Sequence, residues 1–110
     1  MRIWDVQVDR LCRSHLLGEH RELHAIWNII TQGKKGYATH PETKRWIGKL
    51  HALYRRHEEQ VREIERRGWR HGSPLDEALA VGLAYQDAFV TAVEEQKKML
   101  TERGCGCLSE

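Results

Sequence analysis

Two histidines and a glutamate lie close together in the stretch LLGEHRELHAIW, residues 16–27. In the metalloprotease pattern H-E-x-x-H, the glutamate directly follows the first histidine and so lies near the metal-bound water. Here Glu22 comes two positions after His20 and two before His24. At about 100° per residue, Glu22 lies on nearly the opposite side of a helix from His20. The spacing excludes this type of zinc site, and Glu22 needs a different role.

The chain contains seven histidines, which raises the question of another kind of metal site. Apart from His20 and His24, no pair has strong ligand spacing, and no third ligand is obvious nearby. His20 and His57 fall on predicted apolar helix faces, so both are expected to be hydrogen-bonded core histidines. Cys105 and Cys107 lack a second ligand pair and are expected in a disordered tail. The sequence therefore predicts neither a metal nor a cofactor.

Glu22 shares a predicted helix face with His15, seven residues earlier. Both lie at the edge of the apolar stripe, where a carboxylate is half-shielded and its pKa is open to adjustment. From spacing alone, an ordinary surface acid paired with Arg21 or His15 is the favoured interpretation.

Size and composition describe one soluble domain that spans residues 1–110. Charged residues make up 31% of the 110 residues and apolar ones 40%, which is typical of globular proteins. The sequence contains neither an apolar run of about 20 residues nor a signal-peptide pattern. Three cysteines do not suggest a secreted disulfide framework. We expect a cytoplasmic monomer with no membrane partner.

Charge is divided unevenly along the chain. Residues 1–72 contain 15 Lys and Arg against 9 Asp and Glu, whereas residues 73–110 contain 3 against 7. A basic first part is compatible with a nucleic-acid surface, although an uneven solvated surface explains composition alone equally well. The predicted contacts with the DNA backbone, outside the acid-rich later turns, are Lys34, Lys35, Arg45 and Lys49.

Apolar periodicity predicts three helices and an all-α fold. The first helix runs from about Asp9 to Gln32, before Gly33, and the second covers residues 43–67. The third covers 74–103, since Ser73-Pro74-Leu75-Asp76 resembles a helix start. Residues 3–8 are expected to be extended, and residues 104–110 to form a flexible tail.

Three stretches of the sequence together resemble the pyrimidine-dimer DNA glycosylases, the family of the small bacteriophage UV-repair endonuclease. The resemblance covers roughly residues 1–70, and the fixed distance of the Arg-Glu-Leu motif from the N-terminus makes it fairly specific. The matching stretches are Met1-Arg2-Ile3, His15-Leu16 with Arg21-Glu22-Leu23, and the segment from Lys49-Leu50 to Arg66-Arg67-Gly68-Trp69.

The resemblance implies a compact all-α enzyme whose N-terminal tail lies between helices. It also implies that the N-terminal α-amine, here that of Met1, is the nucleophile and that Glu22 is its essential partner. With the resemblance added, a catalytic role for Glu22 becomes the favoured interpretation. Arg2, Arg21 and His15 match positions that contact the substrate.

The chemistry is consistent with this assignment. An α-amine has a pKa near 7.7–8.0, so about 10–20% of it is unprotonated at pH 7. The expected activity is a glycosylase with abasic-site lyase activity on damaged pyrimidines in duplex DNA, without a cofactor. The phage enzyme's basic, aromatic C-terminus is absent here, and the lesion stays open: a cyclobutane dimer, an oxidised pyrimidine or an abasic site. The alternatives are a non-catalytic DNA-binding module and, more distantly, a histidine-based metal-binding protein.

Overall fold

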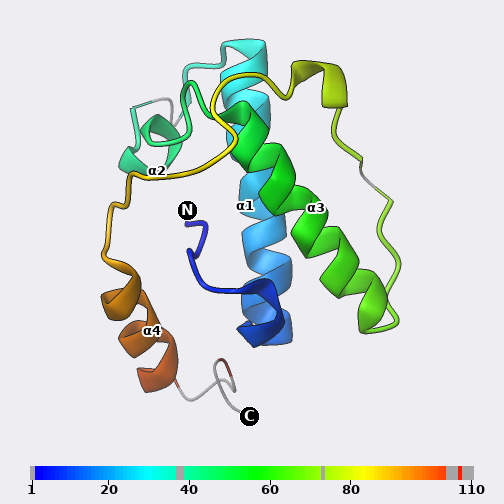
Figure 1. The fold of residues 1–110 in the computed structure, drawn as a ribbon, viewed down its shortest axis with the longest axis vertical. Coiled ribbons are helices and arrows are strands. Elements are labelled where there is room, and N and C mark those ends of the chain that lie inside the picture. Colours follow the sequence, from blue (N-terminus) through cyan, green and yellow to red (C-terminus); the bar gives the residue numbers. More distant parts are fainter. Residues whose placement is uncertain (1, 37–38, 73, 104–106, 108–110) are drawn as a thin grey trace.

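Two long helices, which run in opposite directions, dominate the structure (Figure 1). The structure is a computed structural model that describes residues 2–36, 39–72, 74–103 and 107. The helices are α1 (Arg13–Gln32), α2 (Pro41–Lys44), α3 (Leu50–Arg66) and α4 (Val93–Glu102), with short 3-10 turns at Val8–Arg10 and Glu77–Leu79. Within the described ranges no β-strand is formed, only the isolated bridge between Lys49 and Gly82. The all-α prediction is confirmed.

The first predicted helix is confirmed at its end and shortened at its start. Gly33 adopts the left-handed conformation with φ 64°, and its N–H donates to the carbonyl of Ile29. This is the usual way for a glycine to close a helix. At the other end, Val8–Arg10 form a separate 3-10 turn and Leu11 is extended, so α1 begins only at Arg13.

The second predicted helix, 43–67, is in fact two helices. The chain leaves α2 through a turn that contains Gly48 at φ 79°, a conformation that breaks a right-handed helix. After this turn α3 begins, and no side chain caps its N-terminal end. Instead, the N–H groups of His51 and Ala52 donate to the carbonyls of Val81 and Leu83, at 2.9 and 3.0 Å.

The prediction of a helix over residues 74–103 is wrong for most of its length. Asp76 caps only one 3-10 turn, by accepting from the N–H of Ala78, and the α-helix begins at Val93. The segment between them passes over the start of α3, and its carbonyls cap that helix. Three large apolar residues that lie within the predicted helix are exposed in the structure, namely Leu79, Leu83 and Val90.

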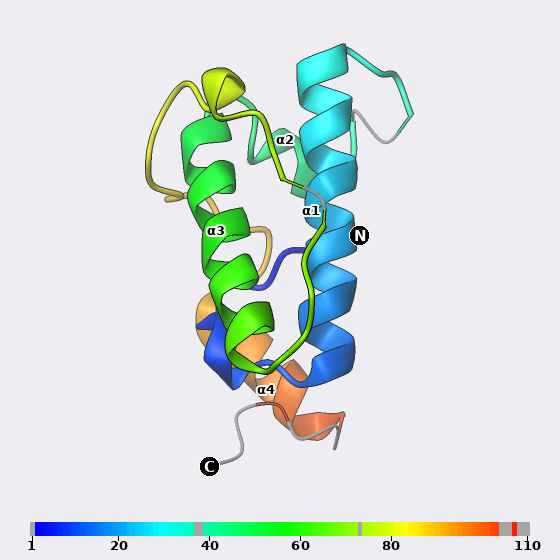
Figure 2. The ribbon, with the colours of Figure 1, turned by 90° about the vertical axis from the view of Figure 1, so that its right-hand side faces the viewer.

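The core consists of two buried clusters along α1. One cluster joins Ile3 and Trp46 to Leu23, Ile26, Trp27 and the start of α3. The other joins Trp4 and Val6 to Leu16, Ile64 and Leu100. Residues 3–6 thus lie inside the molecule, beside the middle of α1 and between it and α4 (Figures 1 and 2). This confirms the expected buried N-terminal segment.

Of the predicted flexible tail, only residue 107 belongs to the described part of the chain. Cys107 is buried in the second cluster, so the expectation of an unpacked tail is wrong at this position. Across the described ranges, no helix is both long and apolar enough to cross a lipid bilayer.

Candidate active site

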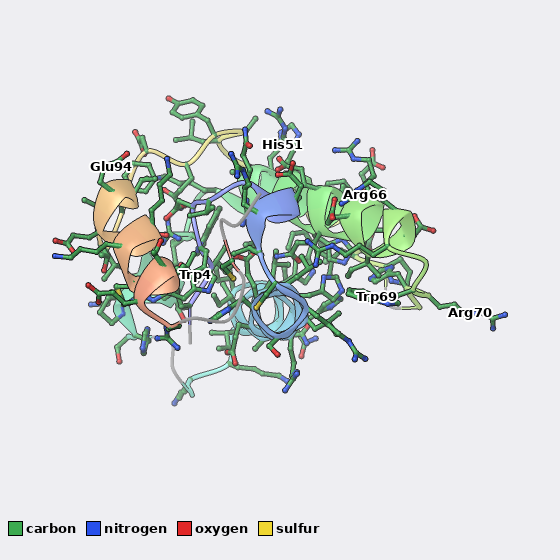
Figure 3. The ribbon with its side chains drawn as sticks, turned by 90° about the horizontal axis from the view of Figure 1, so that it is seen from below. Trp4, His51, Arg66, Trp69, Arg70 and Glu94 are labelled. Atoms are coloured by element: carbon green, nitrogen blue, oxygen red, sulfur yellow. The ribbon has the colours of Figure 1, made fainter. Side chains whose placement is uncertain are left out.

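Hydrogen bonds hold each of residues 3–5 in place on the helices around it. The N–H of Trp4 donates to Glu19 Oε1 at 2.7 Å, and the N–H of Asp5 donates to Gln96 Oε1 at 2.7 Å. The carbonyl of Ile3 accepts from Arg45 Nη2 at 2.9 Å. Viewed along α1, Trp4 lies between α1 and α4 (Figure 3). The path of the chain that leads back toward residue 1 is therefore set by buried polar contacts.

Glu19, which sequence reasoning missed, is the central acceptor of this network. Its side chain is fully buried and accepts two bonds from Arg56, at 2.9 and 3.0 Å. Gln60 Nε2 donates to the same carboxylate. Burial by itself would lower the pKa of Arg56, but the charge of Glu19 and the bonds to it raise that pKa above its ordinary value. Glu19 falls on the apolar stripe of α1 between Leu16 and Leu23, and a charged residue on such a stripe was the available indication.

Glu22 lies one turn further along α1 in a different environment. The residue is half-buried, and within the described ranges no hydrogen bond or ion pair engages its carboxylate. Arg21 beside it is exposed. Arg2 is half-buried, with its guanidinium carbon 4.9 Å from the centre of the Trp4 ring. Met1, the predicted nucleophile, lies outside the described residues.

His15, predicted to contact the substrate, has two sulfur neighbours. Its Nδ1 lies 3.1 Å from Cys12 Sγ and 3.2 Å from Cys107 Sγ. Its ring meets that of Trp4 edge-on at 5.6 Å. Burial lowers the pKa of His15, the charge of Arg103 lowers it further, and Glu19 opposes both. Cys107 therefore gains near neighbours that its sequence position did not suggest.

The prediction that Arg45 contacts DNA is corrected by its burial. Its Nε donates to Glu42 Oε2 at 2.7 Å, and Nη1 donates to Asp5 Oδ1 at 3.1 Å and to the carbonyl of Ala88 at 2.9 Å. Together with the bond to Ile3, these contacts use the whole guanidinium to hold the N-terminal segment. The arginine is a structural residue, because only 4% of its side chain is exposed.

The three predicted lysines differ in their surroundings. Lys49 Nζ pairs with Asp87 Oδ1 at 2.6 Å and donates to Gln86 at 2.8 Å, so its charge is already engaged. Lys34 and Lys35 are exposed at the end of α1. They line a surface cavity of about 480 Å³ whose other walls include Ile29, Ile30 and Ile47. Of the three, Lys34 and Lys35 are the cations available to a phosphate.

Comparison with known proteins assigns the family. A profile of the family described as "Pyrimidine dimer DNA glycosylase" matches residues 1–77, which is more than half of the chain. The chain belongs to the pyrimidine dimer DNA glycosylase family. Comparison with curated proteins and with solved structures returned no significant match.

Membership of the pyrimidine dimer DNA glycosylase family indicates a DNA-repair glycosylase in general terms, with DNA that carries pyrimidine dimers as its substrate. The matched residues include the N-terminal segment, α1 and α3, which together form the network around Glu19. They end before the segment that caps α3 and before α4, so those parts are outside the family match.

Proposed function

We propose that the protein removes damaged pyrimidines from duplex DNA and then cleaves the abasic strand, with the α-amine of Met1 as nucleophile and Glu22 as its partner. The observation that carries this proposal is the contrast between a firmly held N-terminal segment and an uncommitted carboxylate one turn along α1 from Glu19, the residue that holds Trp4. Trp4 and Asp5 are held by buried acceptors, whereas the Glu22 carboxylate has no partner among the described residues. A segment held by hydrogen bonds, with a free carboxylate on the same helix that holds it, suits a positioned amine.

The proposed reaction proceeds through an imine. The unprotonated amine attacks C1′ of the damaged nucleotide, the bond from C1′ to the base breaks, and the base leaves and takes up a proton. Loss of the amine's protons as the sugar ring opens produces an imine between Met1 and C1′. Removal of a C2′ proton then expels the 3′ phosphate, and water hydrolyses the imine to restore the amine.

Glu22 is suited to two tasks in this sequence. Its negative charge stabilises the cationic form of the imine, and its oxygens accept and return protons as the sugar opens. Because the carboxylate is half-buried, it is partly shielded from water, which strengthens its electrostatic effect. The lesion must leave the base stack for this chemistry, and a distorted dimer lowers that cost.

Four exposed or half-buried cations are the proposed phosphate contacts: Arg2, Arg21, Lys34 and Lys35. Arg21 directly precedes Glu22, so a phosphate bound there would bring the neighbouring sugar toward the carboxylate. Phosphate contacts of this kind position the substrate without reading its sequence.

The test is borohydride trapping on duplex DNA that contains an abasic site. We expect a covalent adduct that mass spectrometry maps to Met1, from protein whose free N-terminus has been verified. A chain extended at the N-terminus should give no adduct at that position. An adduct on a lysine instead would contradict the assignment of the nucleophile.

The role of Glu22 is tested by Glu22→Gln, compared with Glu65→Gln on the exposed face of α3. Loss of a proton-transfer group costs about 10²- to 10⁴-fold in rate, so trapping should fall by that factor in the first variant and stay unchanged in the second. Unimpaired strand cleavage by the Glu22 variant would instead favour a mechanism without it. Binding without cleavage by the unaltered protein would favour the non-catalytic DNA-binding module.

A further inference from the structure

Four histidines from three separate parts of the chain meet at the side of α1 that faces α3. His20 and His24 come from α1, His57 from α3, and His71 from the segment after α3. One ligand nitrogen from each ring lies within 4.8 Å of the other three. The ring centres are 4.7–6.4 Å apart. The sequence predicted no metal because no third ligand was apparent near His20 and His24. Spacing along the chain does not reveal that His57 and His71 lie next to this pair in the fold.

Hydrogen bonds determine which nitrogen of His20 faces the cluster. The Gln60 amide nitrogen donates to the Glu19 carboxylate, which can only accept, so the amide oxygen must point toward His20. That oxygen lies 2.7 Å from His20 Nδ1, which therefore carries the proton. His20 Nε2 is left with a lone pair, and it is a buried atom with no hydrogen-bond partner among the described residues. A partner fixed on the second nitrogen is typical of metal-binding histidines.

His57 is oriented in the same way by a second carboxylate. Its Nδ1 lies 3.0 Å from Glu58 Oε1, so the proton resides on Nδ1 and the lone pair on Nε2. His57 is fully buried, and its Nε2 lies 3.2 Å from His24 Nε2. For a tetrahedral zinc ion with Zn–N distances of about 2.0–2.1 Å, neighbouring ligand nitrogens are about 3.3 Å apart. This contact is a hydrogen bond between the two rings, and its length is close to the separation that an ion bound by both nitrogens requires.

The cluster also favours the uncharged imidazoles that bind metals. Burial lowers the pKa of His24 to about 4, and the charges of His20, His57 and His71 add to this effect. Burial is likewise the main reason that the pKa of His20 is lowered, against the hydrogen bond that His20 donates to Gln60, which raises it. A surface cavity of about 450 Å³ is lined by His20 and His71, together with Trp69 and Arg70, and offers a route for an ion. Arg70 itself points away from the molecule (Figure 3).

We propose that His20, His24, His57 and His71 bind one divalent transition-metal ion, with Zn²⁺ as the first candidate. Neutral imidazoles suit Zn²⁺, Cu²⁺ and Ni²⁺, whereas Mg²⁺ and Ca²⁺ prefer oxygen ligands. Four protein ligands leave no open position, as in structural rather than catalytic zinc sites. The ion would fasten α1, α3 and the segment after α3 to one another.

The site is adjacent to the network that holds the N-terminal segment. His20 contacts Gln60, Gln60 contacts Glu19, and Glu19 accepts from the N–H of Trp4. An ion that fixes His20 therefore supports the position of residues 3–5. This inference stands on the cluster alone and does not depend on the proposed glycosylase chemistry.

The experiment uses untagged full-length protein, freed of metal by a chelator and dialysed, then titrated with ZnCl₂. We expect one equivalent of zinc per chain by metal analysis. At 100 times the dissociation constant, zinc should raise Tm on the order of 10 °C. Folded protein that takes up no zinc would overturn the proposal.

Matched variants locate the ion. His24→Gln and His71→Gln should lose the bound equivalent and the rise in Tm, whereas His51→Gln, an exposed histidine on α3, should retain both. His71 lies outside the helices, so we expect His71→Gln to fold. This variant tests the proposal even if His24→Gln does not fold. The competing cluster of Cys12, His15 and Cys107 is tested by Cys12→Ser. Zinc lost from that variant but retained by both histidine variants would overturn the proposal.

Discussion

Glu19 and Glu22 are separated by one turn of α1, but they have opposite environments. Glu19 is completely buried and engaged by Arg56, Gln60 and the Trp4 N–H, whereas Glu22 is half-buried with no described partner. A carboxylate that is already paired is poorly suited to develop a new interaction in a transition state, because the existing partners must be given up first. The residue environments thus separate a structural glutamate from a candidate catalytic one.

Substitution by glutamine should greatly lower the free energy of unfolding at Glu19 and hardly change it at Glu22. Glu19→Gln leaves the buried charge of Arg56 without its counter-ion, and we expect it to lower the free energy of unfolding by about 3–5 kcal/mol. Glu22→Gln should change it by less than about 0.5 kcal/mol. Urea unfolding of both variants at pH 7 checks this. Equal losses would mean that Glu22 has a structural partner after all.

At the scale of elements, the segment after α3 replaces the missing cap of that helix. The carbonyls of Val81 and Leu83 accept from the first turn of α3, and the Leu83 N–H donates back to the carbonyl of Gly48 at 3.0 Å. This close approach depends on Gly82, which has φ 90° and whose added Cβ would overlap the Gly48 carbonyl. These backbone groups bond to the start of α3 and to Gly48, so they are not available for hydrogen bonds within a helix of their own. The tertiary contact thus overrides the local helix pattern of the sequence.

Gly82→Ala should therefore be far more damaging than Gly33→Ala. Gly33 also has a positive φ of 64°, but its added Cβ meets nothing within 4 Å, so its cost is that of the backbone alone, about 1–2 kcal/mol. For Gly82→Ala we expect about 2–5 kcal/mol, since steric overlap adds to the strained backbone. Thermal unfolding of the two variants makes the comparison. Similar losses would show that the capping contact yields easily to the added methyl group.

At the scale of the whole molecule, the basic residues of the first 72 positions do not form one uniform surface. Arg45, Arg56 and Lys49 are tied to acidic partners inside or across the fold. Lys34 and Lys35, by contrast, are exposed. The net charge of a segment therefore overstates the number of cations that can meet DNA.

The salt dependence of DNA binding should identify the available cations. Each phosphate contact contributes about 0.9 to the slope of log K against log salt concentration. Lys34→Ala combined with Lys35→Ala should reduce the magnitude of that slope by up to about 1.8. The matched control is Lys97→Ala with Lys98→Ala, another exposed pair, on α4, and it should leave the slope unchanged. An unchanged slope in the first double variant would remove this loop from the proposed DNA surface.

The sequence by itself determined the all-α class and the end of α1 at Gly33, and its resemblance to the family implied the burial of the N-terminal segment. It also carried the Arg21-Glu22-Leu23 motif of the family. These features depend on local periodicity, on glycine's access to positive φ, and on motifs with fixed spacing, all of which are present in a linear chain.

Only the tertiary structure decided which charged and polar residues have partners. The pairing of Glu19 with Arg56 spans 37 positions, and the distance in sequence from Asp5 to Gln96 is 91. The meeting of His20 and His24 with His57 and His71 is of the same kind. Such contacts arise when packing brings distant segments together. The same packing left most of the predicted helix 74–103 non-helical, and two carbonyls of that stretch cap α3 instead. Residue spacing along the chain does not predict these partners, because burial and pairing are properties of the folded chain.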